Sequence, residues 1–338
     1  MATDAHQVTL PHPRDRIQEQ TATVTHPWAG EQQVRFGVGC GPRDDWPALR
    51  EFVQRAEELG FDSYSLPDHP MVMPSCWTTL AGLAAVTRRI RLLPLVSCVY
   101  YANPVILARM VADIDRMSDG RAVLGLGSGD MPREFAQMGL PYPAPGKRQA
   151  ALEEGLQIIR PLLRGQTVTF NGEHFRTDGA VLRPSPVQQP YVPILIAGGG
   201  ERTTLRYVAQ YADASNLGAA GWAGGAYTPA DVQQKLAVLR QHCTEQGRPY
   251  ASILRSTLFV PTILAETAAA RQAKLDRLPA QLLAFYGQAG LVASPEEAVD
   301  RITALVAAGF RYFIPNVLGN DLETLDLLAR HVIPAVSG

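Results

Sequence analysis

Residues 34–66, which read VRFGVGCGPRDDWPALREFVQRAEELGFDSYSL, contain the pattern on which the rest of the chain is built. The stretch opens on a short apolar run, 34–40, that a Gly-Pro turn ends. The segment 46–59 follows with its apolar residues at helical spacing, and Gly60 supplies the left-handed residue that commonly ends a helix. A second apolar run, 61–66, comes next. The stretch therefore predicts a strand, a helix and a second strand in succession.

The same strand-then-helix unit recurs along the chain. Further apolar runs of strand length lie at 90–99, 121–127, 193–197, 213–217, 253–260 and 312–316, and helical patterns at 77–86, 105–117, 149–163, 203–211, 231–243, 265–286, 295–308 and 322–332. Eight such units predict the α/β class and a single (β/α)8 TIM barrel with strands buried on both faces. A doubly wound open sheet is the alternative, but the G-x-G-x-x-G fingerprint that often accompanies it does not occur in the sequence.

Two segments fall outside this rhythm. Residues 1–33 are polar and lack a period, so we expect a tail or a clamp on the surface, ahead of a barrel domain at 34–338. Residues 164–192 form an insertion after the fourth helix of the barrel. Within it an Asn-Gly pair at 171–172 predicts a two-residue hairpin turn.

Composition excludes several classes of partner. Of 338 residues, 46% are hydrophobic and 19% are charged, as in an ordinary globular protein with ample core. Lys plus Arg number 31 and Asp plus Glu 32, so there is no overall basic field for nucleic acid or an anionic membrane. Because no uncharged apolar stretch of about 18 residues occurs, we expect no membrane span.

The cysteines and the N-terminus predict a cytoplasmic protein. The four cysteines form no C-x-x-C pair, which argues against a zinc ribbon and favours free thiols in a reducing compartment. The first residues lack the basic and then apolar pattern of a secretion signal. The seven histidines have no partner at helical i, i+4 spacing, so we expect no metal site.

The site of a TIM barrel lies at the C-terminal ends of its strands. Asp68 and His69 follow the second strand and are the only titratable pair of general acid and base type at a strand end. Because imidazole has a near-neutral pKa in water, we expect His69 to be catalytic, with Asp68 beside it. The alternative is a structural pair that caps the next helix.

Two glycine-rich turns also lie at strand ends. Gly198–Gly200 opens the helix after the fifth strand, where backbone N–H groups without side chains suit a phosphate. Gly127–Gly129 ends the fourth strand, with a spacing that does not match the G-x-S-x-G nucleophile elbow. Each turn alone is compatible with a plain flexible loop. Together, at one barrel mouth, they indicate a ligand with a polar tail, such as a flavin or deazaflavin phosphate.

Residues 103–129, which read NPVILARMVADIDRMSDGRAVLGLGSG, resemble the strand-three to strand-four signature of the luciferase-like monooxygenase superfamily. That family consists of TIM barrels that use reduced flavin or the deazaflavin coenzyme F420. Residues 152–159, with the hairpin after them, and residues 198–217 are similar to further segments of the family. The resemblance runs from about residue 34 to residue 334. It implies a small-molecule substrate and a homodimer.

The Asp68-His69 pair resembles the coenzyme F420-dependent branch of that family. The resemblance implies His69 as the proton donor or acceptor, and a non-proline cis peptide near Leu95–Val96 behind the coenzyme ring. Arg148 and Arg202 begin helices beside the barrel mouth, where guanidinium groups suit the anionic oligoglutamate tail of F420. The residues expected around the cofactor are Asp68, Leu95, Val96, Ser97, Gly127, Ser128, Gly129, Arg148, Gly198, Gly199, Gly200, Arg202, Asn216 and Leu217.

Two features depart from the sugar-phosphate dehydrogenases of this branch. The first strand carries no acidic residue at 36–40, and 70–73 lacks their aromatic residue. The chain instead offers residues for an apolar pocket, namely Met71, Met73, Tyr100 and Tyr101. The alternatives to an F420-dependent oxidoreductase are an FMN-dependent monooxygenase and a relative that binds a cofactor without catalysis.

Overall fold

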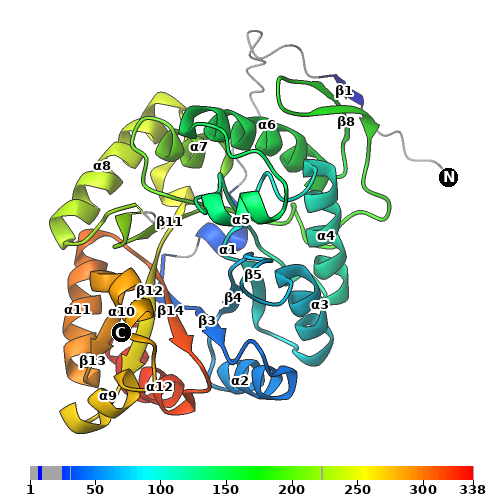
Figure 1. Cartoon of the computed structure of the whole chain (residues 1–338). Helices are drawn as coiled ribbons and strands as arrows, with labels where there is room; N and C mark the ends of the chain where they lie inside the picture. The colour runs from blue at the N-terminus through cyan, green and yellow to red at the C-terminus, as the bar shows by residue number, and fades with distance from the viewer. Residues whose placement is uncertain (1–6, 10–24, 31, 222–223, 338) are drawn as a thin grey trace.

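The computed structural model describes residues 7–9, 25–30, 32–221 and 224–337. At its centre nine parallel strands curve into a nearly closed barrel with helices on the outside (Figure 1). In spatial order the strands are β5 (Arg91–Pro94), β4 (Ser63–Leu66), β3 (Val38–Gly41), β14 (Tyr312–Leu318), β12 (Leu254–Leu264), β11 (Ala214–Gly218), β10 (Ile194–Ala197), β7 (Leu124–Gly127) and β6 (Ser97–Cys98). The predicted TIM barrel is confirmed.

The two ends of this path belong to one interrupted strand. Only two residues separate β5 from β6. Leu92 in β5 donates its N–H to Arg121 and accepts from Val123, both at 3.0 Å, which joins β5 to the segment that leads into β7. The first strand is interrupted in the same way, because β2 (Arg35–Phe36) precedes β3 and also pairs with β14.

Helices return along the outside of the barrel after each strand. They are α2 (Trp46–Glu58), α3 (Cys76–Val86), α4 (Pro104–Met117), α6 (Pro145–Leu163), α7 (Thr204–Tyr211), α8 (Pro229–Glu245), α11 (Pro295–Ala308) and α12 (Leu322–Leu327), which a π-helical turn at Leu328–Val332 joins to α13 (Ile333–Ser337). Their starts follow from side chains at the N-caps. Asp45, Ser75 and Asn103 each accept a hydrogen bond from a first-turn N–H, and Thr228 and Ser294 form capping boxes.

Apolar side chains fill the barrel in two layers. The inner layer includes fully buried Leu93, Val123, Leu195, Leu254 and Ile314, which come from different strands or their edges. The outer layer lies between the strands and the helices and is the larger cluster. The barrel interior is therefore a packed core, as in other TIM barrels.

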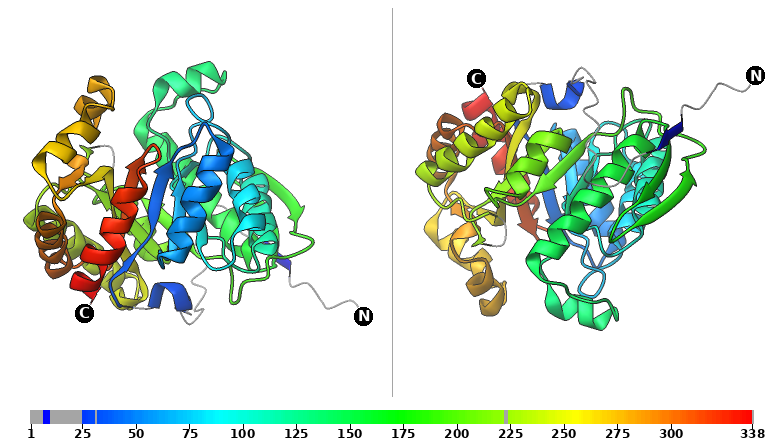
Figure 2. Two further views of the ribbon diagram at one scale, coloured as in Figure 1. Left: turned by 90° about the horizontal axis from the view of Figure 1, so that it is seen from below. Right: turned by 90° about the horizontal axis from the view of Figure 1, so that it is seen from above.

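The short helix α1 (Pro27–Gly30) closes the N-terminal ends of the strands. Trp28 is 2% exposed and meets Tyr312 edge-on with ring centroids 5.8 Å apart. Figure 2 shows α1 (blue) and α5 (Pro132–Gln137, green) on opposite sides of the barrel. The interpretation of residues 1–33 as a tail or clamp falls largely outside the described residues.

The insertion after α6 differs in detail from the prediction. Its strands are β8 (Thr167–Asn171) and β9 (Arg176–Ala180), which pair antiparallel, and β1 (Gln7–Thr9) pairs parallel with β8. The predicted two-residue turn is wrong, because the turn spans Gly172–Phe175. The N–H groups of Glu173, His174 and Phe175 all donate to the carboxylate of Glu154 on α6, which stabilises this wider turn.

Two more elements were not foreseen. The helix α5 lies between residues 127 and 149, where the sequence pattern predicts neither a helix nor a strand. The predicted helix at 265–286 is wrong as one element, because β12 extends to Leu264 and two short helices follow, α9 (Ala268–Leu275) and α10 (Ala280–Tyr286). Pro279 forces the break between them, since proline cannot continue a helix. The strand β13 (Leu291–Ala293) then pairs with β12.

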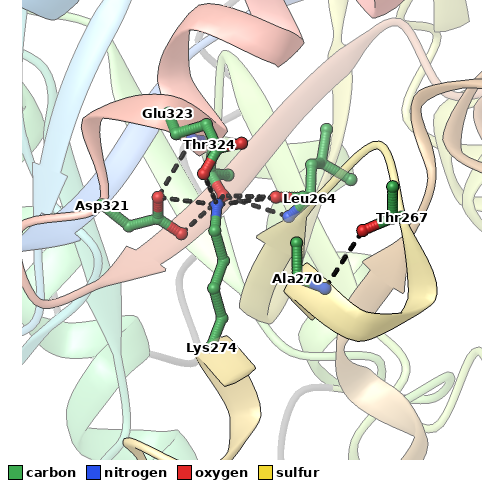
Figure 3. A network of polar contacts seen from close by, with 7 residues as sticks. All are labelled: Leu264, Thr267, Ala270, Lys274, Asp321, Glu323 and Thr324. Atoms are coloured by element: carbon green, nitrogen blue, oxygen red, sulfur yellow. Dashed lines mark hydrogen bonds and ion pairs between the residues drawn. The ribbon is translucent and has the colours of Figure 1, made fainter. Parts of the chain in front are cut away.

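The side chain of Lys274 connects α9 to the start of α12 (Figure 3). Lys274 Nζ donates to the carbonyl of Leu264 at 2.7 Å, to Asp321 at 2.8 Å and to Thr324 at 3.2 Å. Glu323 lies 3.1 Å from the same ammonium group. These contacts fix the connection after β12 against the start of α12. Within the described ranges, the structure has no helix long and apolar enough to cross a bilayer.

Candidate active site

A cavity of about 460 Å³ lies at the C-terminal ends of the strands, within the range of about 300–1,000 Å³ of small-molecule sites. The residues predicted from the sequence that line it are Asp68, His69, Leu95, Val96, Ser97, Gly127, Ser128, Gly129, Gly198, Gly199, Gly200 and Asn216. Further residues in its wall are Cys98, Tyr101, Asp130, Gln149, Ala197, Thr204, Gly221, Gly224 and Leu258. Turns that are distant in sequence therefore meet at one site.

Three of the predicted residues do not line the cavity. Leu217 is fully buried in the outer core. Arg202 is exposed at the start of α7. Arg148 is buried, and its guanidinium donates to the carbonyls of Gly129 at 3.1 Å and Pro143 at 2.6 Å. Arg148 thus supports the cavity wall from behind.

Asp68 is a buried carboxylate at one side of the cavity. Its Oδ2 accepts hydrogen bonds from Ser97 Oγ at 2.6 Å and from Trp77 Nε1 at 3.1 Å. Burial raises the pKa of Asp68, and these two hydrogen bonds oppose the rise. The expected non-proline cis peptide is present at Leu95–Val96, in the same wall. Asp68 thus joins the end of β4 to the start of β6.

His69 does not pair with Asp68 in this structure; its ring contacts Glu134 on α5. The Nδ1 atom of His69 lies 2.9 Å from Oε2 of Glu134, whose side chain is 1% exposed. Tyr101 donates its hydroxyl to the same oxygen at 2.7 Å. Sequence reasoning missed Glu134 because it lies two residues inside a helix that was not predicted.

Two further polar groups in the wall were given no role from the sequence. Asp130 is an exposed residue at the cavity, where partial desolvation raises the pKa of its carboxyl and neighbouring His69 opposes the rise. Burial raises the pKa of the Cys98 thiol to about 12. Cys98 is therefore a neutral thiol at physiological pH and not a nucleophile.

Two glycines in the cavity wall are packed too closely for a side chain. A side chain at Gly127 would meet Val96 at 2.9 Å, and one at Gly129 would meet Cys98 at 2.7 Å. Gln149 from α6 donates to Ser128 Oγ at 3.1 Å and so fixes the turn between these glycines. The Gly-Ser-Gly turn is thus required by close packing at the floor of the site.

The Gly198–Gly200 turn contains two N–H groups that no described residue accepts from. The N–H of Gly198 donates to the carbonyl of Asn216 at 3.0 Å and is not available to a ligand. Within the described ranges, the N–H groups of Gly199 and Gly200 donate to no protein acceptor. Lys235, which the sequence did not single out, donates to the carbonyl of Gly199 at 3.0 Å. Its charge adds to the positive end of α7 at this turn.

The side-chain oxygen of Asn216 is a buried acceptor that receives no hydrogen bond from the described residues. It is 1% exposed, and its Nδ2 donates to Ser256 Oγ at 2.9 Å. Its Oδ1 has no hydrogen-bond partner in the part of the chain that the structure describes. A buried amide oxygen left without a donor costs free energy, so a ligand N–H or O–H here is expected. The Asn216 oxygen as acceptor, together with the N–H groups of Gly199 and Gly200 as donors to a phosphate, fits a flavin or deazaflavin.

The other sequence expectations concern metals and an apolar pocket. Within the described residues no group of His, Cys, Asp and Glu is arranged to hold a metal ion, and the four cysteines are free and buried. Of the proposed apolar residues only Tyr101 lines the cavity, while Met71 is 44% exposed beside it. The walls are therefore more polar than the sequence suggested.

Comparison with known proteins identifies the family. The model of the luciferase-like monooxygenase family matches residues 20–289. The F420-dependent tetrahydromethanopterin reductase of Methanopyrus kandleri superposes with a TM-score of 0.76 at 21% identity, over 90% of this chain and 99% of that one.

Two other structures are similarly close in fold. An F420-dependent secondary alcohol dehydrogenase gives a TM-score of 0.75 at 20% identity, over 90% of this chain and 100% of that one. A monooxygenase from Streptomyces bottropensis gives 0.76 at 21% identity, over 89% of this chain and 99% of that one. The family model covers most of the chain, and this protein therefore belongs to the luciferase-like monooxygenase family.

Proposed function

We propose that this protein is a coenzyme F420-dependent oxidoreductase that transfers a hydride between F420 and a small organic substrate. The observation that carries the proposal is His69, whose ring lines the cavity while Nδ1 contacts a buried carboxylate. Hydride transfer to or from a carbonyl needs a proton moved as well, and an imidazole held at the wall suits that task. When bound, F420 supplies the ring carbon that accepts or gives the hydride.

The chain's own residues would bind and orient the reactants. The N–H groups of Gly199 and Gly200 would donate to the cofactor phosphate at the start of α7. Asn216 Oδ1 would accept from the cofactor. The Leu95–Val96 segment, with Asp68 and Ser97 beside it, would form the surface against the ring. His69 Nε2, which has no hydrogen bond to the described residues, would hold or release the proton at the substrate oxygen.

The cavity wall restricts the substrate. None of its described residues is a lysine or an arginine, whereas Asp68 and Asp130 contribute carboxyl groups. A phosphorylated substrate would therefore meet no lysine or arginine among the described residues of this wall, in keeping with the departures from the sugar-phosphate dehydrogenases. A neutral alcohol or carbonyl compound fits this wall better. The secondary alcohol dehydrogenase among the similar structures makes small alcohols and ketones the first probes.

An FMN-dependent monooxygenase is the second candidate. The same glycine turn and the same Asn216 oxygen would serve a flavin phosphate, and similar structures include monooxygenases. A spectroscopic titration with F420 and with FMN separates the two. We expect F420 to bind at least tenfold more tightly, and its absorbance to change on addition of a substrate alcohol.

Other results of this titration point elsewhere. Tighter binding of FMN, with oxygen consumption by the reduced flavin, would favour the monooxygenase. Binding of F420 without turnover on any probe would favour a relative that binds the cofactor and lacks the reaction. We also propose a homodimer, on the family resemblance alone, and a cytoplasmic location, on cysteines that form no C-x-x-C pair. Sedimentation velocity gives the oligomeric state directly.

A further inference from the structure

Glu134 makes three contacts that its burial renders costly to lose. Oε2 accepts from Tyr101 at 2.7 Å and lies 2.9 Å from His69 Nδ1, and Oε1 accepts from the N–H of Met71 at 3.2 Å. The side chain is 1% exposed and does not line the cavity. Glu134 therefore acts on the cavity only through the residues that it contacts.

The contacts decide which hydrogen the imidazole carries. The N–H of Met71 can only donate, so Oε1 accepts. The Tyr101 hydroxyl remains protonated, because burial and its hydrogen bond to Glu134 raise its pKa well above the ordinary value. Both carboxylate oxygens already accept from these donors, so the short contact to His69 is a hydrogen bond in which Nδ1 carries the hydrogen and donates it.

We propose that Glu134 is a positioning residue that holds neutral His69 as its Nδ1–H tautomer, which leaves Nε2 as the basic nitrogen facing the cavity. This inference rests on the proposed function, because it makes Nε2 the atom that handles the substrate proton. A carboxylate that orients a catalytic imidazole is an established physical device. Here α5 supplies it from behind the wall.

Tyr101 contacts both Glu134 and its neighbour on α5. Its ring packs against Phe135, the neighbour of Glu134 on α5, with centroids 5.5 Å apart. Its hydroxyl donates to the oxygen that His69 also contacts. A second donor on this oxygen fixes the position of the carboxylate and hence the orientation of the imidazole.

A purely structural role for Glu134 is the competing explanation. In that case the carboxylate only stabilises the loop after β4 through the N–H of Met71. Both explanations predict some loss of stability when Glu134 is changed. They differ in what happens to the tautomer of His69, so the tautomer is the quantity to measure.

The test is ¹⁵N nuclear magnetic resonance of the full chain with labelled histidine, without cofactor, at a pH where His69 is neutral. The His69 signals are assigned with His69→Gln. We expect wild-type His69 in the Nδ1–H form. In Glu134→Gln one amide cannot accept from all three donors, so we expect the Nε2–H form to gain at least a third of the population. Tyr101→Phe keeps the carboxylate and should leave the tautomer unchanged.

The same spectra contain their own control. His242, which contacts Glu201 and Glu245 far along the chain, should not respond to any of these changes. Wild-type His69 in the Nε2–H form would overturn the proposal even if Glu134→Gln failed to fold. So would an unchanged tautomer in a folded Glu134→Gln protein. Neither result depends on F420 binding, so failure of the proposed function is detected separately.

A kinetic measurement completes the test where a substrate is found. Glu134→Gln should lower kcat about 10- to 100-fold, the usual loss when an outer-shell partner is removed. The Kd for F420 should stay within twofold, because Glu134 does not line the cavity. Equal loss of kcat in Glu134→Gln and Tyr101→Phe at unchanged tautomer would contradict the assignment of the effect to Glu134.

Discussion

The two ends of the barrel use the same kinds of residue in opposite ways. At the N-terminal ends of the strands, Asp62 accepts from Trp28 at 3.0 Å, from Tyr312 at 2.6 Å and from Arg35 at 3.0 Å. At the C-terminal ends, the pKa of buried Asp68 is raised and the Oδ1 of Asn216 has no partner in the described residues. In TIM barrels the first end serves stability and the second serves function.

We call the N-terminal ends of the strands, which α1 covers, the closed end, and the C-terminal ends, which form the cavity, the open end. The largest effect is expected from Trp28→Ala at the closed end. Loss of a buried tryptophan typically costs about 3–5 kcal/mol of unfolding free energy. Cofactor affinity of the folded variant should stay within twofold, because α1 lies at the N-terminal ends of the strands and none of its residues lines the cavity at their C-terminal ends. Figure 2 shows α1 on the side of the barrel opposite to α5. Denaturant unfolding and cofactor titration check both statements.

A control separates packing from the hydrogen bond to Asp62. Trp28→Phe keeps a ring and removes the donor, so its cost should be smaller, about 0.5–1.5 kcal/mol for one lost hydrogen bond, because Asp62 Oδ2 still accepts from Tyr312. A Trp28→Ala protein that lost less than about 1 kcal/mol would show that α1 does not hold this end together, since deletion of a packed tryptophan costs several times more.

The next effect concerns the glycine turn at the open end. A Cβ atom at Gly199 would lie 2.7 Å from Gly224 Cα, so Gly199→Ala must shift the backbone that we expect to hold the phosphate. A hydrogen bond to a charged group contributes about 1.5–3 kcal/mol, which predicts a tenfold or greater loss of F420 affinity.

The control for Gly199 is Gly146→Ala, where an added Cβ would meet nothing within 4 Å. It should leave F420 affinity unchanged. An analogue of the cofactor without phosphate should bind Gly199→Ala and the wild type about equally. A similar loss for this analogue would place the phosphate elsewhere.

Arg148 and Arg202 both lie near the cavity, but we expect Arg148 to serve stability and Arg202 to serve cofactor binding. Arg148 stacks 4.1 Å above Tyr142 and donates to two carbonyls, so Arg148→Ala should lower the melting temperature. Arg202 is exposed at the rim, and its Ala variant should weaken binding of long-tailed F420 at most about tenfold, since exposed charge pairs contribute little. Binding of F420 with and without its oligoglutamate tail checks this. Equal losses for both ligands in Arg202→Ala would argue against a tail contact.

The smallest effect is a pH dependence at Asp68. Since burial raises its folded-state pKa above the unfolded value of about 3.9, the proton is bound more tightly in the folded state. The stability that this confers is present in acid and is lost as the pH rises through the folded-state pKa. Asp68→Asn should therefore be at least as stable as the wild type at pH about 7, with no advantage below pH about 4.

Unfolding free energies of both proteins at these two pH values measure this difference. An advantage of Asp68→Asn that grew in acid would contradict the sign. The same variant should bind F420 less well if the charge of Asp68 serves the site. Stability gained where function is lost is the expected mark of the open end.

The barrel could be predicted from the sequence because its signal is repeated. Eight apolar runs, each followed by a helical pattern, allow few architectures. The errors lie where tertiary contacts decide, as at the turn of the hairpin, which the carboxylate of Glu154 widens from another element. The prediction of one helix at 265–286 follows the apolar spacing and disregards Pro279, which marks the break between α9 and α10.

The site was predictable only as far as strand ends carry it. Asp68, His69 and the glycine turns directly follow strands, and the structure brings them together. Glu134 and Lys235 lie inside helices, where a charged residue looks like any solvated one. Their importance comes from burial and from contacts with distant residues, which spacing along the chain does not encode.

The most direct test of the account is His69→Ala, with turnover, F420 affinity and melting temperature measured on one preparation. A general acid or base contributes about 10²- to 10⁴-fold in rate, so we predict a loss of that size. F420 affinity should change little, whereas the melting temperature should fall somewhat, because buried Glu134 loses one of its three contacts. Turnover within about twofold of the wild type, far short of a general acid–base loss, would remove His69 from the mechanism. The claim that a residue at the C-terminal ends of the strands transfers the proton would then be wrong as well.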